Sequence, residues 1–128
     1  TGGGPAYINL WMASNNLMRW EVIGNTGQTY LAINATTAFA TGIWYHVVGT
    51  FDGATNRLYI NAAQEASTTT GGTNIPTSTS TTVAIGAYSQ GPAYPLAGHI
   101  SLAKVYNRAL SASEILKNYN ALKGRYGL

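Results

Sequence analysis

The sequence contains few side chains that could take part in acid–base catalysis. Its 128 residues include four acidic residues, Glu21, Asp52, Glu65 and Glu114. A glycoside hydrolase needs two carboxyl groups about 5 to 9 Å apart, one holding a proton while the other carries charge. No two of the four acids stand two residues apart on one predicted strand. The sequence therefore disfavours a hydrolase and predicts that the protein is not an enzyme.

The other candidates for catalysis or metal binding have structural explanations. Glu114 is expected to cap a helix, and Asp52 to hold a turn by accepting hydrogen bonds from backbone amides rather than to bind calcium. His46 and His99 lie in apolar segments without a second histidine or a carboxylate at ligand spacing. The sequence has no cysteine and no G-x-S-x-G motif. We expect packed, hydrogen-bonded histidines, no bound metal and no cofactor.

Sugar binding is the chemistry that one segment favours. Residues 86–98, with the sequence GAYSQGPAYPLAG, place Tyr88, Ser89, Gln90 and Tyr94 among glycines and prolines. Exposed tyrosine rings can stack on the C–H face of a sugar while amide and hydroxyl groups bind its hydroxyls. These four residues form the predicted glycan site. An ordinary loop whose tyrosines cover the edge of the core explains the same pattern.

Composition indicates one domain with a neutral polar surface. A chain of 128 residues is long enough for one modest core, and its charged fraction is 9% where about a quarter is usual. Seven cations and four acids give a formal net charge of +3. This is too little positive charge for a surface that binds a nucleic-acid backbone. Five of these cations lie within residues 104–125, where a solvated helix face is the simplest interpretation. No apolar run reaches the roughly 18 residues of a membrane span.

Alternating apolar and polar residues predict strands through most of the chain. Turn-forming residues such as Asn16 and Asp52 separate neighbouring segments, so consecutive strands should pair antiparallel. Trp20 and Trp44 alternate with apolar neighbours and are expected in the core, whereas Trp11 suits either a core or an interface. The predicted strands span residues 7–12, 17–23, 29–34, 43–51, 57–61, 82–88 and 98–106.

A polar segment and one helix complete the expected architecture. Residues 67–82 are rich in Thr, Ser and Gly, which predicts a surface loop or an extended edge segment. Ser111 and Glu114 have the spacing of a capping box, and Gly124 follows the last apolar residue at helical spacing. A helix is therefore predicted over 111–123. The fold class predicted is an all-β antiparallel sandwich with one short C-terminal helix.

The segment at residues 42–53, GIWYHVVGTFDG, carries a known pattern together with RLYIN at 57–61. It resembles the central hairpin of laminin-G-like (concanavalin A-like) jelly-roll domains, whose strands read W-x-H-V-x-x-T-[YF]-D-G and then L-Y-[VI]-[ND]-G. VAIG at 83–86 and the segment 96–111 are similar to the final strands and helix entry of the same family. The resemblance covers about residues 20–122 and implies a jelly roll.

The chain departs from this family pattern in two places. Ala62 stands where the family has glycine, so the second hairpin turn is expected to differ in type or to carry strain. The opening strands of the family are not recognisable, so residues 1–128 are expected to form a single domain that lacks its N-terminal strands. Such a sandwich exposes sheet edges. Neighbouring copies of the chain, or upstream residues, are expected to cover the edge near residues 7–12.

The resemblance and the scarcity of catalytic groups predict a function in structure and adhesion. We expect a non-catalytic module on an extracellular or virion surface, with glycans or cell-surface polysaccharides as partners. Residues 106–128 are also similar to the ends of such domains in structural proteins of tailed bacteriophages, which favours the virion. The alternative is a secreted carbohydrate-binding lectin module. A glycoside hydrolase fragment would need its acids from upstream residues.

Overall fold

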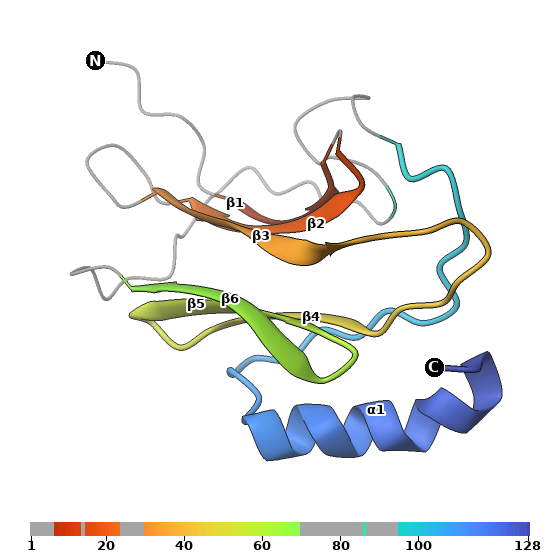
Figure 1. Ribbon diagram of the computed structural model, residues 1–128. Helices are drawn as coiled ribbons and strands as arrows, with labels where there is room; N and C mark the ends of the chain where they lie inside the picture. The colour runs from red at the N-terminus through yellow and green to blue at the C-terminus, as the bar shows by residue number, and fades with distance from the viewer. Residues whose placement is uncertain (1–6, 14, 24–29, 70–85, 87–94) are drawn as a thin grey trace.

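The computed structural model describes residues 7–13, 15–23, 30–69, 86 and 95–128. Within these residues, the strands form two three-stranded sheets whose neighbours pair antiparallel in chain order (Figure 1). One sheet consists of β1 (Tyr7–Met12), β2 (Leu17–Ile23) and β3 (Tyr30–Ala38). The other consists of β4 (Val47–Phe51), β5 (Thr55–Ile60) and β6 (Ala63–Thr69). The sheets face each other, which confirms the predicted antiparallel jelly-roll sandwich.

Alternate residues of the two sheets meet in the core between them. Ile33 and Ala35 of β3 pack against Leu58 and Ile60 of β5, and Leu58 is fully buried. Every second side chain of a strand points to the same face, which is why these residues are spaced by two. Burying an aliphatic side chain of this size contributes about 1.5–3 kcal/mol. This cluster is therefore the main apolar contact that holds the sheets together.

Helix α1 (Ala112–Tyr126) covers the outer face of the second sheet (Figure 1). Tyr59 lies between Leu58 and Ile60 on β5 and points to the opposite face, where it packs with Leu110 and Ile115. Ile115 is fully buried in this cluster. The described residues thus form three layers, in the order sheet, sheet and helix.

Trp20 of β2 fills the space above Gly49 of β4. A Cβ atom at Gly49 would lie 2.4 Å from the Trp20 ring, which is far inside van der Waals contact. The Trp20 indole Nε1 donates a hydrogen bond to the Thr50 carbonyl at 3.2 Å. The expected place of Trp20 in the core is confirmed, and the absence of a side chain at residue 49 is what allows it.

Two β-bulges interrupt the regular ladders. Between the pairs Arg19–Asn34 and Leu17–Ala38, β2 advances two residues while β3 advances four. On β6, Glu65 is the extra residue, because successive residues of β5 pair with the residues on either side of it. A bulge leaves residues unpaired and bends its strand. The backbone groups of β3 in this stretch therefore need other partners.

The hairpin turn from β5 to β6 carries the strain that the sequence predicts. Asn61 has φ 50° and Ala62 has φ 68°, so both central residues are left-handed, as in a type I′ turn. Asn tolerates this region, but the Cβ of alanine makes it costly. The Asn61 side-chain Oδ1 also accepts a hydrogen bond from the His46 backbone N–H at 2.9 Å.

The first two strands agree with their predicted bounds, and the next three differ. β3 begins at Tyr30 and continues to Ala38, beyond the predicted end at residue 34. β4 begins at Val47 instead of residue 43, because residues 43–46 form no ladder. β5 spans Thr55–Ile60 where 57–61 was predicted. The alternation of apolar and polar residues along one strand does not show where the neighbouring strand ends, and therefore does not show where pairing begins or stops.

The sequence analysis missed one strand and placed another wrongly. Residues 63–66 of β6 were not predicted as strand. Residues 67–69 belong to the segment for which a surface loop or an extended edge segment was predicted, and they form the end of β6, an edge strand among the described strands. The predicted strand 98–106 is wrong, since residues 99–106 are exposed and form no strand with the described part of the chain. The predicted strand 82–88, apart from Gly86, lies outside the described residues.

The C-terminal helix is longer than predicted. It begins after Ser111, whose side chain accepts a hydrogen bond from the Glu114 backbone N–H, so the predicted capping box is confirmed. It continues through Gly124 and ends at Gly127, which has φ 67° and donates its N–H to the Lys123 carbonyl. Among the described residues, no helix has the length and apolar character that a membrane span requires.

Candidate functional site

The predicted glycan site cannot be located in the structure. Tyr88, Ser89, Gln90 and Tyr94 lie outside the described residues. The candidate site must therefore be sought among the acids, imidazoles, aromatic rings and cations of the remaining chain.

Asp52 holds the turn between β4 and β5. Its Oδ1 accepts hydrogen bonds from the backbone N–H groups of Ala54 at 3.0 Å and Thr55 at 2.8 Å, and its Oδ2 pairs with Arg57 at 2.6 Å. The hydrogen bond from Arg57, followed by those from the two backbone amides, lowers the pKa of Asp52 to about 2. The predicted turn role of Asp52 is confirmed.

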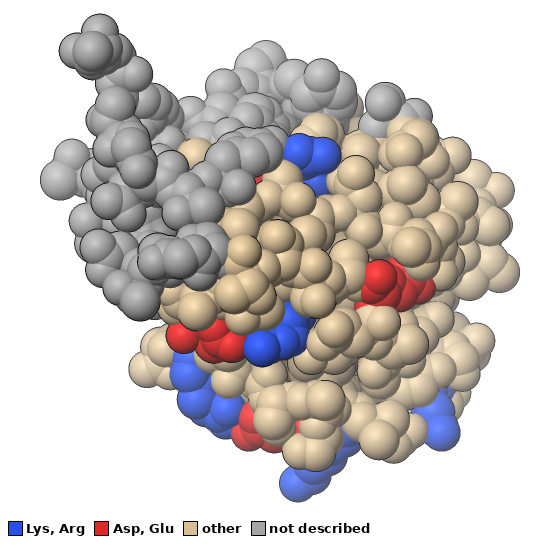
Figure 2. All heavy atoms as spheres, turned by 60° about the vertical axis from the view of Figure 1, so that its left-hand side comes forward, with Lys and Arg blue, Asp and Glu red and all other residues tan. Residues whose placement is uncertain are grey.

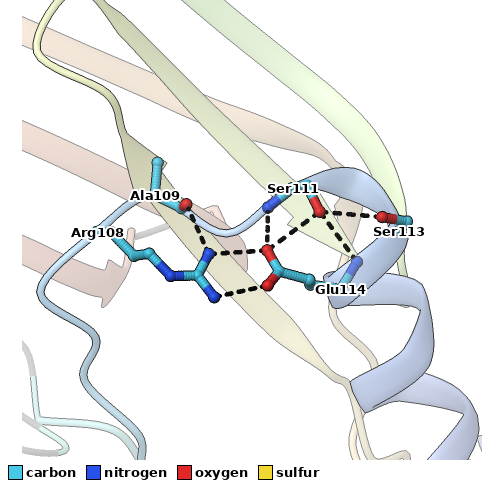
Figure 3. Close-up of polar contacts among 5 residues, drawn as sticks. All are labelled: Arg108, Ala109, Ser111, Ser113 and Glu114. Atoms are coloured by element: carbon cyan, nitrogen blue, oxygen red, sulfur yellow. Dashed lines mark hydrogen bonds and ion pairs between the residues drawn. The ribbon is translucent and has the colours of Figure 1, made fainter.

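Glu114 closes the start of α1 (Figure 3). It accepts hydrogen bonds from the Ser111 backbone N–H at 2.8 Å and from both terminal nitrogens of Arg108, at 2.9 and 2.6 Å. Arg108 and then Ser111 lower the pKa of Glu114 to about 2. The capping role was predicted from the sequence, whereas the two-pronged contact with Arg108, six residues earlier, was not.

The two remaining acids also make structural contacts: Glu65 joins β6 to β3, whereas Glu21 pairs within β2. Glu65 accepts hydrogen bonds from the backbone N–H groups of Thr36 at 2.7 Å and Thr37 at 2.9 Å, and from both hydroxyls. Glu21 is buried on β2 and pairs with Arg19. All four acidic residues of the chain are thus among the described residues, and each one contacts an arginine or a backbone turn, cap or bulge.

The two histidines have different surroundings. His46 is half-buried and its ring faces Tyr119 of α1, with the ring centres 6.0 Å apart. Burial, and then the positive charge of Lys104, lower the pKa of His46. Its Nδ1 is buried without a hydrogen-bond partner among the described residues, so packing is confirmed for this histidine but hydrogen bonding of Nδ1 is not. The prediction for His99 is wrong, because His99 is exposed and lies outside any strand.

Trp44 is 38% exposed and is not the core residue that the sequence predicts. The segment before β4 carries its side chain toward the C-terminal end of α1, where its ring lies 5.3 Å from the ring of Tyr126 at an angle of 49°. The Tyr126 hydroxyl is fixed by a hydrogen bond of 2.6 Å with Ser101 Oγ. An exposed indole is therefore held in a defined position by a helix and by an extended segment.

Two cations of α1 lie over tyrosine rings of the same helix. Lys123 Nζ lies 6.0 Å from the centre of the Tyr119 ring, and Arg125 Cζ lies 5.6 Å from that of Tyr126. Both distances are within the range of a cation–π contact. Lys104 is the third cation of this region, since its charge acts on His46.

The cations of this region differ from the other cations in having no acidic partner. Arg19, Arg57 and Arg108 each pair with an acid. Within the described part of the chain, the other four of the seven cations form no ion pair, and all four lie in residues 104–125. Figure 2 shows basic side chains at the lower edge of the molecule, on the side where α1 lies in Figure 1. The uncompensated positive charge of the protein is concentrated on the layer formed by α1.

We call the group of Trp44, Tyr126, Lys104, Lys123 and Arg125 the aromatic–cationic face. It combines an exposed aromatic ring with cations that pair with no acid among the described residues. The described residues contain no group of three His, Asp or Glu side chains placed to hold a metal ion. The positive charge of the C-terminal segment was predicted from the sequence as a solvated helix face, and Lys117, Lys123 and Arg125 are exposed on α1. The exposure of Trp44 was not predicted, because its alternation with apolar neighbours resembled a core pattern.

The fold and the site define a class of protein. It is a β-sandwich whose acidic side chains make structural contacts and whose surface carries an exposed aromatic ring. The chain belongs to the laminin-G-type family described as the concanavalin A-like lectin/glucanases superfamily, whose pattern matches residues 1–116. The resemblance seen in the sequence is therefore confirmed. This superfamily includes both lectins and glucanases in its description, so membership alone does not decide between binding and catalysis.

A solved structure supports the same fold. The chain is similar to a crystal structure of an S-layer domain-containing protein from Clostridium thermocellum, with a TM-score of 0.51 and 24% sequence identity over 92% of the chain. The match covers 63% of that structure. A search of curated proteins gives no significant match.

Proposed function

We propose that this protein is a non-catalytic module of a surface protein, displayed outside the cell or on a virion, where it contributes structure and adhesion. The observation that supports this proposal is the use of the acids. Each of the four carboxylates is bound by an arginine or by backbone N–H groups. The pKa values of Asp52 and Glu114, at about 2, are those of ionised groups rather than of a proton donor at neutral pH.

Two surface features favour a role in adhesion. The aromatic–cationic face offers an exposed ring and unpaired cations, and the tyrosine loop at residues 88–94 is a second proposed contact for a glycan. Only 9% of the residues of the chain are charged, and a surface with so little charge does little to oppose close packing in an assembly.

Two measurements on the same protein test the proposal. The first is release of reducing ends from a panel of polysaccharides, where we expect none above a heat-denatured control. The second is binding to a glycan array, combined with fractionation of particles and envelopes from the source organism. Retention in a surface fraction supports the structural module, whereas glycan binding by protein found free in the medium would favour the secreted lectin. Sustained release of reducing ends would refute the proposal.

If a glycan binds, the predicted loop can be tested separately. Tyr88→Ala and Tyr94→Ala are expected to weaken binding by about 1 to 3 kcal/mol, the scale of a lost aromatic contact. Unchanged affinity in both variants would assign the glycan to another surface.

A further inference from the structure

We infer that the aromatic–cationic face is a binding site for an acidic polysaccharide whose charge is carried by ring carboxylates, as in a polyuronate. This inference rests on the proposed function, because it names the ligand class of a surface module that binds without catalysis. Three features of the face support this ligand class: an exposed ring in a fixed position, unpaired positive charge, and their proximity.

The fixed ring is that of Trp44. It is 38% exposed, and Ile43 beside it is 59% exposed, so apolar surface is available to a ligand. Tyr126 packs against the indole, and Ser101 holds Tyr126 through its hydroxyl. A ring that is already immobilised loses little conformational freedom on binding, which favours affinity. The C–H face of a pyranose is an apolar surface that can stack on such a ring.

The charge is that of Lys104, Lys123 and Arg125. None of the three forms an ion pair within the described residues, although arginines elsewhere in the chain pair with acids. The acid nearest in sequence, Glu114, already has Arg108 as its partner. Unpaired cations beside an exposed ring complement a ligand that carries negative charge and an apolar face together.

The distances favour a carboxylate on the sugar ring itself. Arg125 lies 5.6 Å from the centre of the Tyr126 ring, which in turn lies 5.3 Å from that of Trp44. Tyr126 thus contacts both a cation and the exposed indole, so positive charge lies next to the stacking surface. A uronate carries its carboxylate directly on the pyranose ring. Nucleic acid is disfavoured, because the face has too few cations for a phosphate backbone.

The test compares variants of the 128-residue chain in binding to polygalacturonate, with neutral dextran as the reference polymer. Affinity electrophoresis or thermophoresis gives the dissociation constant. We expect binding to polygalacturonate but not to dextran, weakening as salt rises from about 50 to about 500 mM. Trp44→Ala should weaken binding by about tenfold, and Lys123→Ala or Arg125→Ala by about threefold each.

Lys117→Ala is the matched control. Lys117 is an exposed, unpaired lysine on the same helix and has no ring contact among those described. We expect it to bind like the unaltered protein. If Lys117→Ala loses as much affinity as Lys123→Ala, the attraction is that of a general polyelectrolyte and the inference is wrong. Thermal unfolding of each variant separates loss of binding from loss of fold, and the lysine variants remain informative if Trp44→Ala unfolds.

Other outcomes separate this inference from the proposed function. Binding of dextran or another neutral glycan, without polygalacturonate, would overturn the inference and leave an adhesion module. If single-stranded DNA or dextran sulfate binds as tightly as polygalacturonate, the face does not select carboxylates and the inference is wrong. Loss of polygalacturonate binding in Tyr94→Ala but not in Trp44→Ala would move the site to the predicted loop. Cleavage of polygalacturonate would refute the proposed function itself.

Discussion

The Glu65 carboxylate of β6 holds Thr37 of β3 through two hydrogen bonds, one from the backbone N–H at 2.9 Å and one from the hydroxyl. It also accepts the backbone N–H of Thr36 at 2.7 Å. Both ends of this contact lie at β-bulges. The bulge in the first sheet leaves backbone N–H groups of β3 without ladder partners, and the Glu65 side chain of the second sheet accepts their hydrogen bonds. The two sheets are therefore joined by a polar contact as well as by the apolar core.

Replacing Glu65 by alanine should lower the free energy of unfolding by about 1 to 3 kcal/mol, because the backbone N–H groups of Thr36 and Thr37 lose their acceptor. Urea unfolding measures the change. Gln64→Ala is the control, since Gln64 is the exposed neighbour on the same strand and its loss should change stability by less than about 0.5 kcal/mol. Equal effects of the two substitutions would show that the contact between the sheets contributes nothing.

Gly49→Ala should destabilise the fold by about 1 to 3 kcal/mol or more, because the new methyl group would lie 2.4 Å from an atom of the Trp20 ring. Gly124→Ala makes the same chemical change in α1, where a Cβ meets nothing within 4 Å. It should stabilise the protein by about 0.5 to 1 kcal/mol, since alanine is the better helix former. Thermal unfolding of both variants should therefore shift in opposite directions. A harmless Gly49→Ala would mean that Trp20 can move aside.

Ala62→Gly should raise the free energy of unfolding by about 0.5 to 1 kcal/mol. Glycine removes the cost of φ 68° at this position, but it also increases the freedom of the unfolded chain, so the gain is modest. Ala63→Gly, one residue later in β6, should lower stability because glycine weakens a strand. If both changes destabilise, the methyl contact of Ala62 with the Tyr59 cluster outweighs the strain.

Sequence patterns predicted the features that depend on near neighbours. The bounds of β1 and β2, the turn at Asp52 and the capping box all follow from residues a few positions apart. The strain at Ala62 was expected, as one of two alternatives, from the resemblance to a family pattern that has glycine there. Features that depend on distant residues were missed. Glu65 contacts Thr36 and Thr37 across 29 and 28 positions, and no local pattern in this sequence predicts a bulge. Trp44 packs on Tyr126 near the end of α1 and not in the core between the sheets, which its alternation with apolar neighbours does not reveal.

Acid should destabilise the protein through three carboxylates with lowered pKa values. The values for Asp52 and Glu114 fall to about 2. Burial alone would raise the pKa of Glu65, but hydrogen bonds from Thr37 and Thr36 outweigh it and lower the value. A group with a lowered folded-state pKa stabilises the fold above its unfolded-state pKa, and this stability is lost as the pH falls toward the folded-state pKa. We expect the urea midpoint to be flat near neutral pH and to fall from about pH 4.5 to about pH 2.

Glu114→Gln provides the check on this acid dependence. Glutamine cannot titrate, so the variant should be less stable at neutral pH and should show a shallower fall in acid. A slope identical to that of the unaltered protein would show that Arg108 and Ser111 do not lower the pKa of Glu114 in solution.

The edge at β1 should mediate self-association. Ile8 and Leu10 are 48% and 41% exposed, yet they pair across from Val22 and Trp20, so they lie on the face of the sheet that continues into the core. β1 is the edge of its sheet among the described strands, and its sequence YINLWM carries no charge that would oppose pairing with another chain.

We expect sedimentation to show concentration-dependent oligomers, and Leu10→Lys to shift them to monomer. Leu116→Lys, at a residue of α1 that is 49% exposed, removes a comparable apolar side chain far from the edge and should leave the oligomers unchanged. A soluble monomer at high concentration for the unaltered chain would show that this edge needs no partner.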